Sequence, residues 1–161
     1  MVICRLQSTK SPARCPMTYT QVTFKRLTME VENPRKAHIG DAAVDLQTRS
    51  DIVIEPGERV AAPTGLAVAI PEGYAGLVLA RSGHARRAGV GVVNGPGLID
   101  SGYRGEIAVL LINHGDETVR FEAGDRIAQL AIVAVPTVDW VEADDLDPSD
   151  RGEGGFGSSG V

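Results

Sequence analysis

The 161-residue sequence has few aromatic residues, only two cysteines and no long apolar run. Aromatic residues make up 4% of the chain and hydrophobic residues 43%, so the core-forming residues are mostly Val, Ile, Leu and Ala. No apolar run approaches the ~20 residues that a membrane-spanning helix needs, and the N-terminus lacks the apolar middle of a secretory signal. We therefore expect a cytoplasmic protein with an aliphatic core and no membrane partner.

Basic clusters are also lacking outside the first forty residues, and the formal net charge is -5. A nucleic-acid surface depends on many cations that neutralise phosphates, so we expect no nucleic-acid partner. If the ligand is an anion, a few well-placed cations must hold it.

The two cysteines, Cys4 and Cys15, both lie in the first 17 residues, "MVICRLQSTKSPARCPM", which hold three basic and no acidic residues. Two cysteines without further ligands predict neither a disulfide framework nor a zinc site. We expect residues 1–16 to be a disordered extension, or to precede the true start at Met17. The length fits one domain.

Short β-rich segments fill the chain from Gln21 to Val141, among them "VDLQT", "IVIEP", "RVAAP", "LAVAIP", "EIAVLLIN", "RIAQLAIV" and "VDWVEA". They recur roughly every 8 to 12 residues, the spacing of a β-sandwich or barrel. The turn residues of "IPEGYAG", "NHGDET" and "FEAGDR" predict hairpins, and Pro63 and Pro71 are expected at strand ends. We predict an all-β, jelly-roll-like sandwich or barrel over residues 17–141.

Two segments depart from the β pattern. "SGHARRAG" predicts one or two helical turns, with Ser82 as a possible N-cap and Gly89 as the stop. Residues 142–150 hold five acids and Pro148, which predicts a solvated acidic linker. It leads to the glycine-rich arm 151–161, "RGEGGFGSSGV", whose apolar surface is too small to offset its ordering entropy, so we expect this arm alone to be flexible.

"ARSGHARRAG" offers an anion site, because backbone N–H groups at a helix start, the Ser82 hydroxyl and the Arg81 guanidinium all favour phosphate beside Gly83. A strand-to-helix turn with a capping serine explains the same residues. In "VVNGPGLIDSGYRGEI" the glycines around Pro96 predict a tight hairpin with exposed backbone groups. Asp100 then projects from a strand as a candidate general base, or caps a turn with the two residues that follow.

"VRFEAGDRIAQLAIV" predicts a hairpin whose second strand alternates, with Arg126 and Ala128 on one face and Ile127 and Gln129 on the other. A buried glutamine amide needs partners, which are either backbone groups or a ligand. In "GDAAVDLQTRSD", Asp45 places a charge inside a β-like run, and its expected partner is an arginine. A purely structural ion pair is the alternative.

Taken in order, five segments resemble the signature of the homotrimeric dUTPases: "AAVDLQ", "RSGHA", "NGPGLIDSGYRGEI", "GDRIAQLAI" and "RGEGGFGSSG". The resemblance covers Met17 to Val161. It implies the family's β-clip jelly roll, a trimer with three active sites shared between subunits, and magnesium-dependent hydrolysis of dUTP to dUMP and pyrophosphate. That activity keeps uracil out of DNA and supplies dUMP for thymidylate synthesis.

The resemblance also implies residue roles. Asp100 would orient the water that attacks the α-phosphorus, Tyr103 would pack on the deoxyribose and exclude a ribose hydroxyl, and Asp45 would steady the metal's water shell or an arginine. Mg²⁺ would be held mainly by the phosphates and water rather than by protein ligands. Phosphates would be bound by Arg81, Ser82, Gly83 and Gln129, and uracil by Asn94 with the backbone of Gly97, Leu98 and Ile99.

By the same resemblance, residues 151–161 are a lid that orders over bound nucleotide. Phe156 would stack on uracil, while Arg151 and Ser158 or Ser159 reach the phosphates. Gly157 and its neighbouring glycines would let backbone amides approach closely. A closed lid would exclude water and complete the shell of positive charge.

One residue departs from the family pattern: His84 stands where the family usually has leucine, and we expect it to tune packing or pH dependence rather than to do chemistry. Two other functions fit parts of the sequence. A dCTP deaminase shares the fold and an arginine-serine pair, but usually shows "RSS" and lacks the glycine-rich end. A non-catalytic nucleotide sensor would not need Asp100, Tyr103, Gln129 and Arg151 together.

Overall fold

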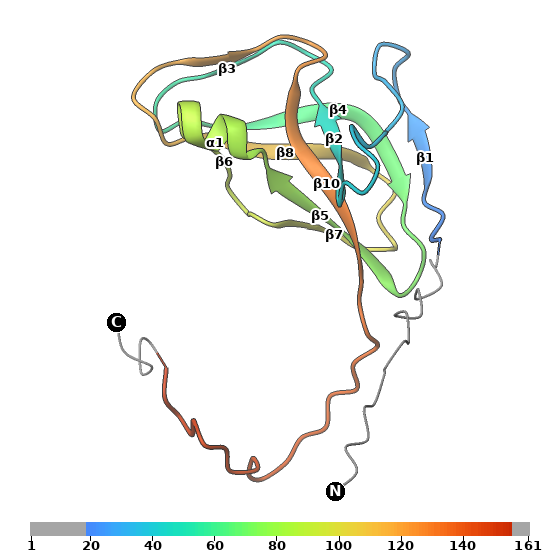
Figure 1. Cartoon of the computed structure of the whole chain (residues 1–161), viewed down its shortest axis with the longest axis vertical. Coiled ribbons are helices and arrows are strands. Elements are labelled where there is room, and N and C mark those ends of the chain that lie inside the picture. The colour runs from blue at the N-terminus through green and yellow to red at the C-terminus, as the bar shows by residue number, and fades with distance from the viewer. Residues whose placement is uncertain (1–18, 156–161) are drawn as a thin grey trace, which may run out of the picture.

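A computed structural model describes residues 19–155 of the chain (Figure 1). The extension predicted at residues 1–16 and the expected ligand-binding residues Phe156, Gly157, Ser158 and Ser159 lie outside the described residues. Ten strands and one helix are present in the described part. They are β1 (Thr23–Arg26), β2 (Ala43–Gln47), β3 (Ile52–Ile54), β4 (Arg59–Ala69), β5 (Tyr74–Ala80), α1 (Ser82–Ala88), β6 (Val90–Val92), β7 (Gly97–Ile99), β8 (Glu106–Asn113), β9 (Val119–Phe121) and β10 (Arg126–Ala134).

The strands form two four-stranded sheets and one two-stranded ribbon, all with antiparallel pairing. One sheet has the order β1-β4-β8-β6, the other β2-β10-β5-β7, and β3 pairs with β9. The predicted all-β jelly roll is therefore confirmed. In Figure 1 the short helix α1 lies at one end of the strands, beside β6.

The predicted hairpins are wrong, because no two consecutive strands of the described chain pair with each other. The turn after Pro71 leads from β4 in one sheet to β5 in the other, and "NGPG" leads from β6 to β7 in the same way. The "NHGDET" and "EAGD" turns lead into and out of β9, which pairs only with β3. Turn residues set where the chain bends, but burial between the sheets decides which strands pair.

The core between the sheets is aliphatic, as the composition predicts. In strand β8, buried and exposed side chains alternate. Ile107, Val109 and Leu111 are at most 2% exposed, whereas Ala108 and Leu110 between them are exposed. This period of two is that of a strand with one face on the core. Phe121 is the single aromatic residue of the described core cluster.

Proline 63 does not end a strand, contrary to the sequence prediction. It lies inside β4, opposite Ala108, where the pairing with β8 shifts register between Pro63 and Ala67. Such irregularities tolerate the missing N–H of proline. Gly65 follows at φ +65, and a Cβ there would lie 2.7 Å from Cγ2 of Val31, so the bulge needs a glycine at this position. Pro71 does follow the end of β4, as expected.

Strand β10 also departs from the predicted alternation. Its pairing with β2 shifts register between Arg126 and Ala128, and Ile127 and Ala128 are both at most 1% exposed. A bulge places two successive side chains on the same side, so the two-faced pattern predicted for this segment is wrong at its start. From Ala128 onward the alternation holds, with Leu130 buried and Gln129 half-buried.

The last predicted strand, "VDWVEA", is not formed. Residues 135–150 contain neither helix nor strand, and Trp140 is 90% exposed. Figure 1 shows this segment leaving the end of β10 and extending away from the sheets. No helix in residues 19–155 has the length and apolar character to cross a membrane.

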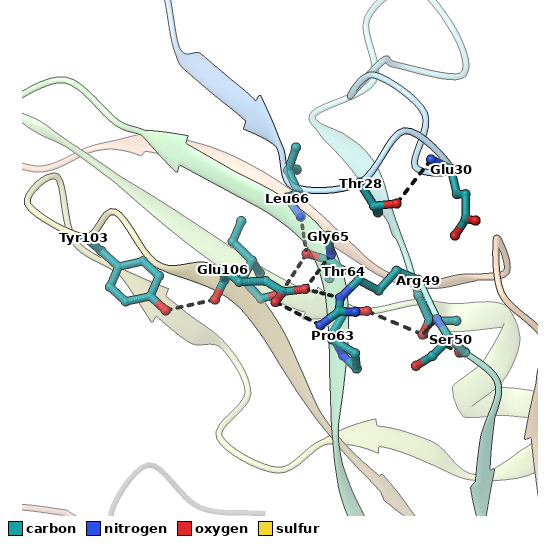
Figure 2. A network of polar contacts seen from close by, with 12 residues as sticks. Thr28, Glu30, Arg49, Ser50, Pro63, Thr64, Gly65, Leu66, Tyr103 and Glu106 are labelled. Carbon is teal, nitrogen blue, oxygen red and sulfur yellow. Dashed lines mark hydrogen bonds and ion pairs between the residues drawn. The ribbon is translucent and has the colours of Figure 1, made fainter.

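An ionic network joins three distant segments beside the start of β8 (Figure 2). Arg49, after β2, pairs with Glu106 through Nε and Oε1 at 2.8 Å. The N–H of Gly65 donates to the same oxygen at 2.7 Å. The Arg49 hydrogen bond, opposed in part by burial, lowers the pKa of Glu106 below its usual 4.5, and the carboxylate raises the pKa of Arg49. The network thus prefers an ionised Glu106.

This network makes stability depend on pH. Because the pKa of Glu106 is lowered in the folded state, its contribution is complete above pH 4.5 and is lost as the pH falls through the lowered pKa. Glu106→Gln should therefore lower the Tm at pH 7 while the gap to wild type narrows below about pH 4.5. Thermal unfolding from pH 3 to 8 at one protein concentration measures this gap.

A matched control is Glu32→Gln, which removes an exposed i,i+3 pair with Arg35 and should leave the Tm nearly unchanged at every pH. If the Glu106→Gln gap stayed constant down to pH 3, the network would not be the source of the pH dependence.

Candidate active site

One cavity, of about 200 Å³, collects the residues expected at the uridine end of the ligand. It lies between β5, β7, β8 and the loops around β7. Its lining includes every residue within 19–155 that was expected at uracil, the sugar and the attacking water: Asn94, Gly97, Leu98, Ile99, Asp100 and Tyr103.

The short strand β7 orients this set. It pairs with β5 through Gly97 and Ile99, and Ile99 is buried in the core at 8% exposure. Leu98 therefore points the other way and is 62% exposed. A Cβ on Gly97 would lie 3.3 Å from Nδ2 of Asn94, so glycine lets the amide approach the β7 backbone. An exposed strand edge and an amide are the groups that can read a flat base.

Asp100 comes one residue after β7 and is exposed. The turn that follows is closed by its carbonyl, which accepts from the N–H of Tyr103 at 3.1 Å. The Asp100 carboxylate takes no part in that backbone bond, so the alternative of a turn-capping aspartate gains no support. The Tyr103 hydroxyl donates to the Glu106 carbonyl at 2.8 Å, which holds the phenol ring at the edge of the cavity (Figure 2).

A second cavity, of about 490 Å³, collects the residues expected at the phosphates. It is lined from three stretches that are far apart in the sequence: β2 with the loop before it, the end of β5 with α1, and β10. The predicted residues brought together here are Asp45, Arg81, Ser82, Gly83 and Gln129; sequence reasoning did not name two others, Asp41 and Arg87, for this site.

Asp45 pairs with two arginines, which agrees with the arginine partner expected from the sequence. Its Oδ1 lies 3.0 Å from Nε of Arg81 and its Oδ2 lies 3.3 Å from Nη1 of Arg126. Arg81 is further held by a hydrogen bond from Nη1 to the Arg126 carbonyl at 3.0 Å. Asp45 thus orients a cation at the cavity, and Arg126 is a member of the network that the sequence did not single out.

The sequence left two kinds of partner open for the Gln129 amide, backbone groups or a ligand. For the amide nitrogen, the structure shows a backbone group. Nε2 donates to the Ala80 carbonyl at 3.1 Å, and Gln129 pairs in register with Asp45 across β2 and β10. The side chain is half-buried and lines the cavity. This bond fixes the amide at the end of β5, next to Arg81.

The predicted N-cap is off by one residue. Arg81, with extended backbone at φ -85 and ψ 125, is the N-cap, and Ser82 is the first helical residue. No side chain caps the helix, so the Ser82 hydroxyl is not used for that purpose. Gly89 ends the helix in the left-handed conformation at φ 66, as predicted.

His84 packs into the same network. Its Nε2 lies 2.8 Å from the Arg126 carbonyl and 3.5 Å from Nη1 of Arg81. Its ring meets Phe121 edge to face, with centroids 5.0 Å apart. Because the carbonyl only accepts, the ring carries a proton on Nε2 and donates it. His84 therefore ties α1 to the bulge of β10.

The two cavities share no lining residue. Arg151 lines neither; it is exposed and sits in a turn of its own, where its Nε donates to the Gly154 carbonyl at 2.6 Å. In residues 19–155 the sequence-predicted residues thus form a uridine group, a phosphate group and a separate Arg151.

Comparison with known proteins connects these groups to one family. The family model described as dUTPase matches residues 29–160. The deoxyuridine 5'-triphosphate nucleotidohydrolase of Nocardia farcinica is 52% identical over 140 residues, which span 86% of this chain and 85% of that protein. Its counterpart in Thermobifida fusca is 51% identical over 141 residues, covering 87% and 79% of the two chains.

Solved structures agree. The dUTPase of Staphylococcus bacteriophage 80alpha with dUpNHpp has a TM-score of 0.83 and 31% identity, covering 89% of this chain and all of that one. A mutant dUTPase of phage phi11, described as coordinating a structural Mg(II) ion, has a TM-score of 0.73 and 26% identity, covering 78% and 98%. By its sequence relatives, its family match and its fold, the chain belongs to the dUTPase family.

Proposed function

We propose that this chain hydrolyses dUTP to dUMP and pyrophosphate by attack of water on the α-phosphorus. The observation that carries the proposal is the sorting of side chains into two cavities, one with groups that suit a uridine and one with groups that suit phosphates. The same reaction is supported by relatives that are named deoxyuridine 5'-triphosphate nucleotidohydrolase and are 50–52% identical to this chain.

Uracil is read by Asn94 and by the backbone of β7. The amide lies against Gly97, and the strand offers its backbone beside the exposed Leu98. Uracil and cytosine exchange an acceptor for a donor on one ring edge, so a site that hydrogen-bonds one base leaves groups unpaired with the other, and discrimination can reach roughly 10⁴-fold. Tyr103, held by the Glu106 carbonyl, packs against the deoxyribose and excludes a 2'-hydroxyl.

Asp100 orients and deprotonates the attacking water. Asp100 is exposed and lines the uridine cavity, directly after the strand β7, which Ile99 anchors in the core. The proton of the water passes to the carboxylate as the oxygen attacks, and pyrophosphate leaves. Arg81, held by Asp45 and the Arg126 carbonyl, is aligned in advance for the charge that develops on the phosphates.

The residues present fit a Mg²⁺ ion held mainly by substrate. Mg²⁺ commonly keeps several waters and binds through one or two carboxylates plus phosphate oxygens, and it would neutralise charge on the triphosphate. Both oxygens of Asp45 already face arginines, so of its two expected roles we favour the orientation of an arginine. No cluster of three or more potential ligands occurs within residues 19–155.

The active form is a homotrimer with shared sites. The support is that one described chain does not place its uridine and phosphate groups in one cavity. In the trimer, a second chain supplies the missing half of each site. The arm that begins at Arg151 comes either from a neighbouring chain or from the same chain, folded over its own site. The cytoplasmic location expected from the sequence stays a prediction.

The decisive test is an assay of all deoxynucleoside triphosphates with and without Mg²⁺. We expect pyrophosphate release from dUTP alone and only with the metal. Asp100→Asn removes the base while keeping the side-chain shape, so kcat should fall roughly 10²- to 10⁴-fold with little change in dUMP binding.

The alternatives give different products. A deaminase would release ammonia from dCTP, and a nucleotide sensor would bind dUTP without releasing pyrophosphate. Full activity of Asp100→Asn would remove this residue from the mechanism. Asp116→Asn, at an exposed loop position outside both cavities, is the matched control and should behave as wild type.

The arm is tested by deletion of residues 151–161. Residues 135–155 form no helix or strand, and none of them belongs to the core cluster. The truncated chain should therefore fold and assemble as wild type by thermal unfolding and light scattering. Turnover should fall sharply, because the closed arm excludes water and adds Arg151 to the phosphates. Undiminished turnover in the truncated trimer would rule out a lid.

His84 is tested by exchange for the leucine usual in the family. Leucine keeps apolar contact with Phe121 but loses the hydrogen bond to the Arg126 carbonyl. We expect hydrolysis to persist, with KM for dUTP raised a few-fold at most, because a neutral hydrogen bond contributes about 1 kcal/mol. Steady-state kinetics from pH 6 to 9 decide it, and an inactive but folded His84→Leu would show that the ring does chemistry.

A further inference from the structure

Arg87 stands in the last turn of α1, yet its side chain returns to the start of that helix. A Cβ built on Gly83 would lie 3.2 Å from Nη1 and 3.4 Å from Nη2 of Arg87. The guanidinium therefore lies over Gly83, and Arg87 lines the phosphate cavity with Arg81, Ser82 and Gln129. Any side chain at position 83 would compete with the guanidinium for this space.

The charges of this cavity leave Arg87 a distinct role. Two carboxylates line it, Asp41 and Asp45, but only one arginine besides Arg87. That arginine, Arg81, is already paired with Asp45 at 3.0 Å. Without Arg87, acidic side chains outnumber basic ones in the lining, which would disfavour an anion.

Arg87 itself forms no ion pair with a carboxylate of residues 19–155. Its five donors are therefore available to a ligand, in the planar fork that suits phosphate oxygens. The neighbouring Arg86 is also exposed but does not line the cavity. Of the two successive arginines, only one is directed to the site.

We propose that Arg87 binds the outer phosphates of the triphosphate, an inference that rests on the proposed function. The α-phosphorus must lie near Asp100, which belongs to the uridine cavity. The phosphate cavity shares no residue with it and so receives the part of the ligand beyond the reacting phosphorus. Arg87 is a contact to the leaving pyrophosphate that adds to Arg81, Ser82 and Gln129.

The experiment compares Arg87→Gln with Arg86→Gln in the full-length chain. Both variants remove one positive charge from the same turn of α1, so they share any general effect of net charge. Arg87→Gln should raise KM for dUTP and Kd for the imido analogue dUpNHpp roughly tenfold, the size of a partly solvated charge-assisted hydrogen bond. Arg86→Gln should change either constant less than twofold.

Two further measurements separate a phosphate contact from a structural role. Inhibition by dUMP, which lacks the outer phosphates, should be the same in wild type and Arg87→Gln. Arg87→Lys should restore part of the affinity, because it keeps the charge but not the fork. The dependence of KM on salt should become shallower in Arg87→Gln only.

Equal effects of the two glutamine variants, or an equal loss of dUMP and dUpNHpp binding, would overturn the inference. Failure of the proposed function has a different signature, since it would appear as a wild-type chain that releases no pyrophosphate from dUTP. The analogue titration reports binding without turnover, so it tests Arg87 in either case. Thermal unfolding of each variant verifies that the fold is retained.

Discussion

The pairing of β10 with β2 on one edge and β5 on the other is the constraint on which the phosphate site depends. It sets Gln129 opposite Asp45 and beside the end of β5, where Arg81 begins α1. Three segments separated by dozens of residues thereby meet within hydrogen-bonding distance. The register matters because a slip of one residue would turn Gln129 and Asp45 to the opposite face.

The bulge at the start of β10 serves the same site. Between Arg126 and Ala128 the strand shifts register, which buries Ile127 and Ala128 together. The Arg126 carbonyl then accepts from both Arg81 and His84. The carbonyl at this irregularity thus anchors a cation that faces the ligand site, a common use of bulges near functional sites.

Much of the fold follows from local chemistry, and what does not follow is non-local. Period-two burial predicts strands such as β8, and turn residues predict where they end, because both depend on neighbouring residues. The pairing of the strands depends on the burial of two apolar faces against each other, so hairpins predicted from "NGPG" and "EAGD" fail. The prediction that Pro63 ends a strand fails for a related reason. The two strands predicted on either side of it are one strand, β4, with an irregularity at their junction.

The candidate site shows the same division. The sequence places Asn94, Asp100 and Tyr103 together because they are neighbours in the chain, and the structure puts them in one cavity. The roles of Arg126 and Arg87 depend on side-chain contacts that sequence spacing does not encode. Arg126 pairs with Asp45 of β2, and the guanidinium of Arg87 lies over Gly83. A glycine four residues before an arginine on a helix is the signal that could have found the second.

The anchoring of the cations explains how a small aliphatic scaffold can suit phosphoryl transfer. This reaction needs positioning and charge stabilisation more than covalent chemistry. An arginine that is free in water loses side-chain entropy when it grips a phosphate, whereas Arg81 is already held by a carboxylate and a carbonyl before the ligand arrives. Asp45 lowers the net charge of the cavity, but in exchange it aligns donors that need little reorganisation as charge develops. Arg87, which forms no ion pair within residues 19–155, restores the positive charge that Asp45 removes from the cavity.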